Sequence, residues 1–396
     1  MTPAAERIRV LIAGILGLML MMGVARFAYT PLLPVMLEQA GLTPAQGSWL
    51  ASINYLGYLS GALFASSITD MSLKDRLYRL GMVVALLSTA GMALTSDWIL
   101  WALLRYVAGL SSAAGLLFGS GLVLNWLIRH HFRSELGVHF AGVGIGIAGC
   151  ALLVDGLSGQ FDWAQQWWWF SAVGAALAVP AWLWLPRPGD TSVTVSGQQL
   201  TDSPPSRLFL RLFMAAYFCA GIGYVISATF IVAIVDAMPS LNGLGNQVFM
   251  LIGLAAAPAC VVWDRIARIT GDLNALIIAS VVQIAGIGLP LVVKTESAAL
   301  ISAVLFGGTF IGIVSLVLTM AGRYYPRHPA KMMGKMTLSY GVAQILAPAL
   351  IALIVGRSGD YSAGLILATG AMIVGSVLLL VLRAVERNEL TLKSAV

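Results

Sequence analysis

Residues 14–37 read GILGLMLMMGVARFAYTPLLPVML, a run long enough to cross a lipid bilayer that nevertheless contains an arginine, Arg26. A membrane-spanning helix needs about 20 predominantly apolar residues. A charged side chain within the bilayer costs at least about 3 kcal/mol on insertion scales, so it normally faces a protein interior or a water-filled cavity. Pro31 and Pro34 disturb the helix beyond it. We therefore predict a transmembrane helix whose outer third is irregular and faces a cavity, with Arg26 as a functional residue.

The rest of the chain is similarly apolar. Of 396 residues, 59% are hydrophobic and 10% are charged, with a mean hydropathy of +0.88, whereas about 25% of residues are charged in soluble domains. Apolar runs of about 18 or more residues recur along the whole chain. The sequence therefore predicts an all-α membrane protein with twelve transmembrane helices, at about residues 10–36, 46–69, 79–96, 98–126, 136–157, 164–185, 208–235, 244–263, 273–293, 297–322, 334–356 and 361–383.

The basic residues indicate how these helices are oriented. If the N-terminus is cytoplasmic, 19 of the 23 Lys and Arg residues lie on the inner side, and only Lys294 and Arg357 lie outside. Such a bias follows the positive-inside rule. We predict that both termini are cytoplasmic and that the protein is a multi-pass protein of the inner (plasma) membrane. The net charge of +6 then reflects topology, and no nucleic-acid partner is expected.

Residues 187–206 differ from the other connections because they are rich in Ser, Thr, Gly and Pro and lack apolar periodicity. We predict a cytoplasmic linker here, joining an N-terminal six-helix bundle (residues 1–186) to a C-terminal six-helix bundle (residues 207–396). The two halves also share an Asp-Arg-x-x-Arg motif, which begins at Asp75 and again at Asp264. Internal repeats of this kind are typical of transporter folds.

Six plus six spans, a central linker, cytoplasmic termini and the repeated Asp-Arg-x-x-Arg motif resemble the major facilitator superfamily over essentially the whole chain. The strings VARFAYTPLLP, HFAGVGIGIAG, FGGTFIGI and YGVAQILAP further resemble its bacterial YbfB-type branch. The resemblance implies two bundles that move around a central site. It also implies that the charged loop motif latches the cytoplasmic gate through ion pairs. The gating residues that it implies are Asp75, Arg76, Arg79, Asp264, Arg265 and Arg268.

Three polar residues, Arg26, Asn54 and Arg105, lie at one predicted depth, about 10 to 16 Å from the outer ends of their helices. No carboxylate is predicted at that level. The nearest acidic residues lie close to outer ends: Glu38, Asp155 and Asp236. An anionic solute could supply the missing charge, because a guanidinium pairs well with carboxylate and phosphate. Alternatively, Arg105 pairs with Asp155 and only holds the N-terminal half together.

Polar side chains of the second half are predicted to complete this site. Tyr224, Thr309 and Gln344 lie near mid-depth in their spans, where transporter sites form at the interface of the repeats. Ordinary interhelical hydrogen bonding is the alternative for each of them. In the first half, Tyr58 shares a helix face with Asn54 and is a weaker candidate.

Two titratable residues are candidates for proton coupling, His139 and Asp155 in the fifth span. His139 has an intrinsic pKa in the physiological range. A lone histidine in a membrane helix is nevertheless more often a hydrogen-bonded packing residue, and this structural role is the alternative for His139.

These features favour a secondary active transporter that moves a small organic, anionic solute by alternating access. Proton-coupled export of lipophilic or drug-like compounds is an alternative, and a non-transporting solute sensor is an alternative of another class. No P-loop, His-Glu-x-x-His or Gly-x-Ser-x-Gly motif occurs, so enzymatic activity is not expected. The three cysteines form no disulfide or metal motif, so neither a metal nor a cofactor is expected. The expected partners are the solute, the lipid bilayer and a coupling proton, and the chain is expected to be a monomer.

Overall fold

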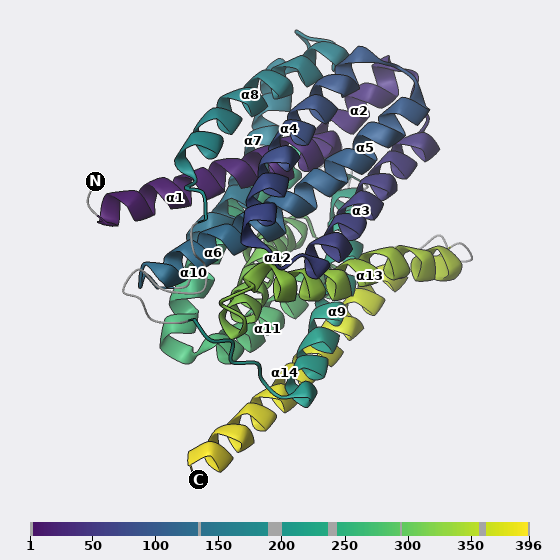
Figure 1. The fold of residues 1–396 in the computed structure, drawn as a ribbon. Helices are drawn as coiled ribbons and strands as arrows, with labels where there is room; N and C mark the ends of the chain where they lie inside the picture. The colour runs from purple at the N-terminus through teal and green to yellow at the C-terminus, as the bar shows by residue number, and fades with distance from the viewer. Residues whose placement is uncertain are drawn as a thin grey trace.

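The computed structural model describes residues 3–133, 136–188, 200–236, 244–293, 295–355 and 362–394. Regular structure within these ranges is entirely helical (Figure 1). The N-terminal half contains α1 (Pro3–Leu18), η1 (Met19–Phe27), α2 (Tyr29–Gln39), α3 (Pro44–Ser67), α4 (Met71–Leu94), α5 (Trp98–Ala113), η2 (Ala114–Gly119), α6 (Ser120–Arg129), α7 (Gly137–Leu157) and α8 (Trp163–Trp184). The C-terminal half contains α9 (Arg207–Asp236), α10 (Gly245–Thr270), α11 (Asp272–Val292), α12 (Glu296–Tyr324), α13 (Pro329–Val355) and α14 (Ser362–Ser394).

Nine helical segments in the described ranges are long and apolar enough to cross a membrane, so the chain is a multi-pass membrane protein. Two of them are composite. The elements α1, η1 and α2 form the segment Pro3–Gln39, and α5, η2 and α6 form Trp98–Arg129. The helices α3, α8 and α13 contain 24, 22 and 27 residues but fall outside this set of nine. Twelve spanning helices with cytoplasmic termini therefore stay a prediction.

Side-chain caps determine where several helices begin. At the start of α3, the backbone N–H of Gln46 donates to the Thr43 hydroxyl (3.3 Å), and the Gln46 side chain accepts from the Thr43 backbone N–H (3.0 Å). Asp162 and Gln165 form the same reciprocal cap before α8. Each cap satisfies N–H groups that have no partner in the first helical turn and contributes about 1 kcal/mol.

The helix α7 is wedged between the first composite segment and the C-terminal half. A Cβ added to Gly146 would lie 3.0 Å from the Cα of Gly23 in η1. On another face, a Cβ added to Gly253 of α10 would lie 2.6 Å from the backbone nitrogen of Ala148. Small residues allow such close approach between membrane helices. The result is a tight seam between η1, α7 and α10.

Hydrogen bonds join the two halves on the predicted cytoplasmic side. The backbone N–H of Gly137, at the start of α7, donates to Oδ2 of Asp264 near the end of α10 (2.5 Å). Nδ2 of Asn125 in α6 donates to the carbonyl of Pro326, just before α13 (3.2 Å). Figure 1 shows α3 and α13 approaching each other at one end and diverging toward the other. These contacts close the predicted cytoplasmic side of the interface.

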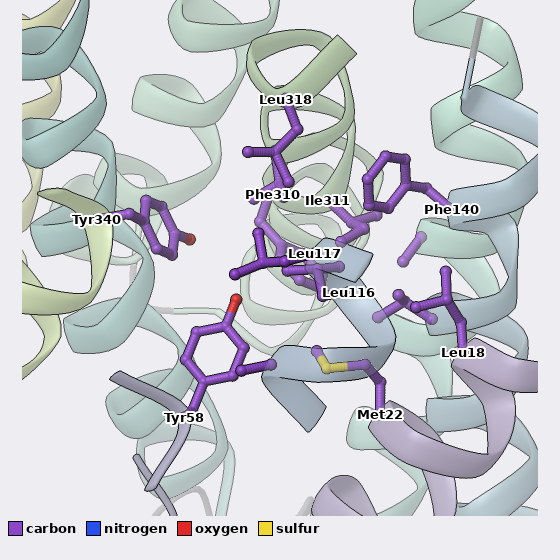
Figure 2. Packing of buried hydrophobic residues seen from close by; sticks show 14 of the residues in the cluster. Leu18, Met22, Tyr58, Leu116, Leu117, Phe140, Phe310, Ile311, Leu318 and Tyr340 are labelled. Carbon is purple, nitrogen blue, oxygen red and sulfur yellow. The ribbon is translucent and has the colours of Figure 1, made fainter. Parts of the chain in front are cut away.

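Large apolar side chains from both halves meet between the bundles (Figure 2). Those labelled in the figure are Leu18, Met22, Leu116, Leu117 and Phe140 from the N-terminal half and Phe310, Ile311 and Leu318 from the C-terminal half. The hydroxyl groups of Tyr58 and Tyr340 point into the same region. The centre of the molecule is therefore an apolar core interrupted by a few polar groups.

Candidate functional site

The backbone around Arg26 is a π-helix rather than a regular α-helix. The N–H of Ala28 donates to the carbonyl of Gly23, five residues earlier (3.0 Å), and this register extends over η1. Pro31 follows, and its missing N–H leaves the carbonyl of Phe27 without its usual donor. Short π segments are rare and occur frequently at functional sites. The irregularity predicted for the outer third of this span thus lies at Arg26 itself, whereas α2 continues as a helix through Pro34.

Arg26 is buried, with 5% of its surface exposed, and its guanidinium lies against aromatic rings. Its Cζ is 4.2 Å from the ring centre of Tyr58, 4.8 Å from that of Tyr55 and 5.5 Å from that of Phe27. Among the described residues, no carboxylate forms an ion pair with it. A cation over desolvated aromatic faces gains about 2 kcal/mol. Such contacts hold the guanidinium in place without neutralising its charge.

Arg105 is equally buried but has backbone partners. Its Nη1 donates to the carbonyl of Ala25 (3.0 Å) and its Nη2 to the carbonyl of Arg26 (3.2 Å). Its guanidinium also lies 4.4 Å from the ring centre of Tyr29. Arg105 therefore holds η1 in position, and through η1 it positions Arg26.

Two other predicted polar residues, Asn54 and Asp155, have partners away from the cavity. Nδ2 of Asn54 donates to the backbone carbonyl of Arg105 (2.8 Å) and thereby joins α3 to α5. Asp155, the alternative partner for Arg105, instead accepts a hydrogen bond from Asn246, so it joins the outer end of α7 to the start of α10. The structure brings Asn54 and Arg105 together and separates both from Asp155.

A central cavity of about 40 Å³ lies between the halves, beside Arg26. Its lining brings together four of the predicted site residues, Arg26, Tyr58, Tyr224 and Gln344. The other lining residues are Met22, Phe27, Leu116, Val143, Tyr217, Phe310, Ile311, Val314 and Tyr340. A cavity needs about 10–15 Å³ to hold one water molecule, so in this conformation the cavity has room only for water-sized molecules.

Together with the predicted Tyr224, three aromatic residues that the sequence analysis did not single out form one wall of this cavity: Tyr217, Phe310 and Tyr340. The ring of Tyr340 stacks on Tyr217 with centres 4.7 Å apart, and Tyr224 stacks on Phe310 at 5.3 Å. The sequence spacing could have identified Tyr217, because it lies seven residues before Tyr224 and hence on the same face of α9. Tyr55, which contacts Arg26, lies three residues before Tyr58 and could have been found in the same way.

Thr309 and His139 are buried outside the cavity lining. The Thr309 hydroxyl donates within its own helix, to the carbonyls of Leu305 (2.7 Å) and Phe306 (3.2 Å). His139 hydrogen-bonds through Nε2 to the hydroxyl of Ser120 (3.0 Å). The structure thus gives each of them a packing environment, and proton coupling by His139 or Asp155 stays a prediction.

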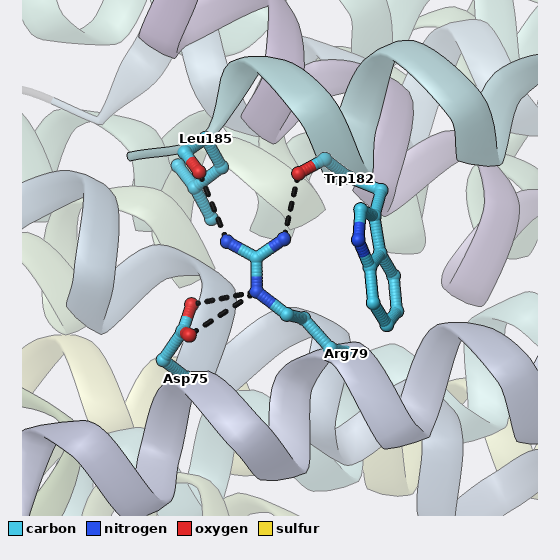
Figure 3. Close-up of polar contacts among 4 residues, drawn as sticks. All are labelled: Asp75, Arg79, Trp182 and Leu185. Carbon is cyan, nitrogen blue, oxygen red and sulfur yellow. Dashed lines mark hydrogen bonds and ion pairs between the residues drawn. The ribbon is translucent and has the colours of Figure 1, made fainter. Parts of the chain in front are cut away.

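The first Asp-Arg-x-x-Arg motif forms contacts within the N-terminal half (Figure 3). Nε of Arg79 lies 3.1 Å from both carboxylate oxygens of Asp75. Its Nη1 donates to the carbonyl of Trp182 (2.6 Å) and its Nη2 to that of Leu185 (3.0 Å), which joins α4 to the end of α8. Arg76 is exposed.

The second motif reaches across the interface. Asp264 accepts from the backbone of Gly137 in the opposite half, whereas Arg265 and Arg268 are exposed. Of the six residues implied to act at the gate, Asp264 thus has a described contact between the halves. The gating role of the set as a whole is not tested by this arrangement.

Helical segments able to cross a membrane, arranged in two halves around a buried central cavity, define a membrane transporter fold. The chain belongs to the family described as "Uncharacterised MFS-type transporter YbfB", whose model matches residues 18–380. No curated protein matches the sequence.

Solved structures of transporters share this fold. The human organic anion transporter MFSD10 (TETRAN) has a TM-score of 0.70 at 17% identity, and the match covers 96% of this chain and 100% of that chain. A bacterial homologue of the iron transporter ferroportin, in an outward-facing state, has a TM-score of 0.70 at 12% identity, covering 96% and 99%. The nucleoside transporter NupG has a TM-score of 0.64 at 12% identity, covering 95% and 99%.

Proposed function

We propose that the protein is a secondary active transporter that moves a small organic anion across the membrane by alternating access. Its membership of a transporter family supports transport, and the central cavity supports the choice of cargo. The similar structures are an organic anion transporter, a bacterial homologue of an iron transporter and a nucleoside transporter, so the choice of cargo depends on the residues of this chain.

The charge of Arg26 is the observation that carries the proposal. Its guanidinium is buried beside the cavity, and no carboxylate pairs with it among the described residues. A buried charge without a counterion is strongly unfavourable. A carboxylate on a bound solute would supply that counterion and could form two parallel hydrogen bonds with the guanidinium.

The aromatic wall narrows the class of anion. The rings of Tyr224 and Phe310 line the cavity and stack on each other with centres 5.3 Å apart, and Gln344 adds an amide that can donate or accept a hydrogen bond. Ring faces of this kind favour stacking with another conjugated ring. We infer a solute with one negative charge and a planar, aromatic or conjugated body.

Movement of the two halves is needed for such a solute to enter. The cavity of about 40 Å³ is smaller than an aromatic carboxylate, and the predicted cytoplasmic side is closed by contacts such as Gly137 to Asp264. Separation of the halves would widen the cavity first toward one side and then toward the other, as alternating access requires. We infer that residues 1–186 and 207–396 are the two moving bundles, in the inner (plasma) membrane of the cell.

Export of uncharged lipophilic compounds is the second candidate function. The observation in its favour is that most cavity-lining residues are apolar, including Met22, Val143 and Val314. A cargo of this kind would leave the charge of Arg26 unpaired, which is why the anion is preferred.

Binding and transport assays with Arg26 variants test the proposal. We expect aromatic carboxylates such as benzoate to raise the thermal stability of the purified protein, and the matching amide, benzamide, to have no such effect. Arg26→Gln should weaken benzoate binding at least about tenfold, since a hydrogen bond to a charged group contributes about 1.5–3 kcal/mol. Arg211→Gln, which changes an exposed arginine of α9, is the matched control.

The same variants in proteoliposomes separate the alternatives. Counterflow of labelled benzoate that is lost in Arg26→Gln and kept in Arg211→Gln supports anion transport. Equal transport by both variants would overturn the role of Arg26. Transport of benzamide instead of benzoate would favour lipophilic export, and binding without any counterflow would favour a sensor.

A further inference from the structure

A second cavity lies on the flank of the N-terminal half, between α3, α4, α5 and η2. Its volume is about 240 Å³, and it shares no lining residue with the central cavity. Phe64 and Leu80 lie at its opening and are each 55% exposed. The remaining lining residues are Gly61, Leu77, Gly81, Val84, Val107, Leu110, Ser111, Ala114 and Phe118.

The lining determines what can occupy this flank cavity. Apart from Ser111, its side chains are apolar, and the Ser111 hydroxyl already donates to the carbonyl of Ala108 (2.7 Å). Apolar cavities stay dry; an engineered apolar cavity of about 150 Å³ binds benzene instead of water. Leu63, which adjoins Phe64 in α3, and Leu87, three residues after Val84 in α4, are also exposed, as suits a surface in contact with lipid. A hydrocarbon chain from the bilayer therefore fits the flank cavity.

Arg76 supplies a charge beside the same cavity. It precedes Leu80 by four residues and Val84 by eight, so all three lie on one face of α4. About 12 Å of helix separates Arg76 from Val84 at 1.5 Å per residue. The Arg76 side chain is exposed and has no hydrogen bond or ion pair among the described residues, in contrast to its buried neighbours Asp75 and Arg79. Its charge is thus available to an anion at the membrane surface.

We propose that Arg76 and the flank cavity bind one anionic phospholipid, with the lipid phosphate at Arg76 and an acyl chain in the cavity. The charge of Arg76 and the apolar cavity lie in the order that a lipid requires, with the headgroup site at the predicted cytoplasmic end of α4 and the chain site deeper along it. Anionic lipids of the cytoplasmic leaflet attract basic residues at this level.

This lipid site also lies next to the central cavity. Ala114 and Phe118 of η2 line the flank cavity, while Leu116 of the same segment lines the central one. The π-helical segment η2 therefore separates the acyl chain from the solute site, and bound lipid would support η2 from outside.

Native mass spectrometry of the purified full chain with phosphatidylglycerol or phosphatidylcholine tests the proposal. We expect the wild-type protein to retain phosphatidylglycerol in preference to phosphatidylcholine. Arg76→Gln should weaken phosphatidylglycerol binding about fivefold, the loss expected for one basic residue at an anionic surface. Arg265→Gln, an exposed arginine at the matching position of the second motif, is the charge-matched control and should retain wild-type binding.

A second pair of variants tests the acyl-chain site. Val84→Phe fills the flank cavity, whereas Val83→Phe adds the same ring at the neighbouring exposed position. We expect Val84→Phe to weaken binding of the lipid and Val83→Phe to leave it unchanged. The proposal is overturned if Arg76→Gln and Arg265→Gln bind phosphatidylglycerol equally, or if Val84→Phe binds it as well as Val83→Phe does. Thermal unfolding in lipid-free detergent establishes that all four variants are folded.

Discussion

At the scale of single residues, Arg26 and Arg105 show how two buried arginines differ in role. Both are at most 5% exposed, yet Arg105 donates to two backbone carbonyls while Arg26 faces the central cavity. The carbonyls of Ala25 and Arg26 lie where the π register of η1 ends and the α register of α2 begins. Arg105 therefore supplies two donors at the point where the register of the helix changes.

Substitution of Arg105 by lysine tests this positioning role. An ammonium group cannot reproduce the planar fork that reaches both carbonyls. We expect Arg105→Lys to lower the free energy of unfolding by about 1–3 kcal/mol for each carbonyl left without a donor, and to weaken solute binding as well. Thermal unfolding without solute measures the first effect, with Arg211→Lys as the control. Lost binding with unchanged stability would mean that Arg105 contacts the solute directly.

At the scale of elements, the seam between α7 and α10 depends on glycine. A Cβ on Gly144 would collide with the backbone of α10 at Ala256 and Ala257, whereas a Cβ on Gly149 would meet nothing within 4 Å. Both glycines belong to α7 and lie five positions apart. The two positions thus provide a matched comparison of close packing and free surface on one helix.

We expect Gly144→Val to destabilise the protein by about 1–3 kcal/mol, because the added atoms overpack a well-filled contact. Gly149→Val should leave the unfolding temperature close to that of the wild type. Thermal unfolding in detergent compares the two variants directly. Similar unfolding temperatures for both would show that α7 and α10 do not need to approach so closely.

The sequence indicated most helices but not the change of register within two of them. Apolar runs predict the part of a helix that lies within the bilayer. The bounds of α8 (Trp163–Trp184) are therefore within one residue of the predicted span, whereas α4 begins at Met71 and the predicted span begins near residue 79. Charged residues such as Lys74 continue the helix beyond the apolar run. A π segment adds one residue per turn without changing composition, so η1 and the carbonyl partners of Arg105 could not be predicted.

The side-chain directions at the site were predictable only in part. Asn54 and Tyr58 share one face by spacing, yet Asn54 hydrogen-bonds to α5 while Tyr58 covers Arg26. Tyr55 reaches the same guanidinium from a neighbouring position. Which of these side chains faces the cavity depends on how closely α3 and α5 approach, and that distance is set by contacts between helices far apart in the sequence.

At the scale of the whole molecule, the predicted cytoplasmic side is closed where loops of the two halves meet. His328 lies in the connection between α12 and α13, and Thr69 in the connection between α3 and α4. Burial lowers the pKa of His328, and the nearby charges of Lys74 and Arg327 lower it further. Asp202 and a hydrogen bond to the backbone of Thr69 act in the opposite direction without reversing the shift. The closed arrangement therefore favours the neutral imidazole.

Closure of this side should consequently weaken in acid. The pKa of His328 in the closed arrangement lies below the ordinary histidine value of about 6.5. The neutral imidazole therefore contributes fully to closure above pH 6.5, and this contribution is lost as the pH falls through the lowered pKa. Protonation then places a third positive charge beside Lys74 and Arg327.

Spin labels on cysteines at the exposed positions Ser67 and Lys335 measure the distance between the halves. We expect that distance to increase between about pH 8 and pH 5. The increase should vanish in His328→Gln and persist in His131→Gln, which changes an exposed histidine in the connection between α6 and α7. An identical response in both variants would show that another group controls the opening.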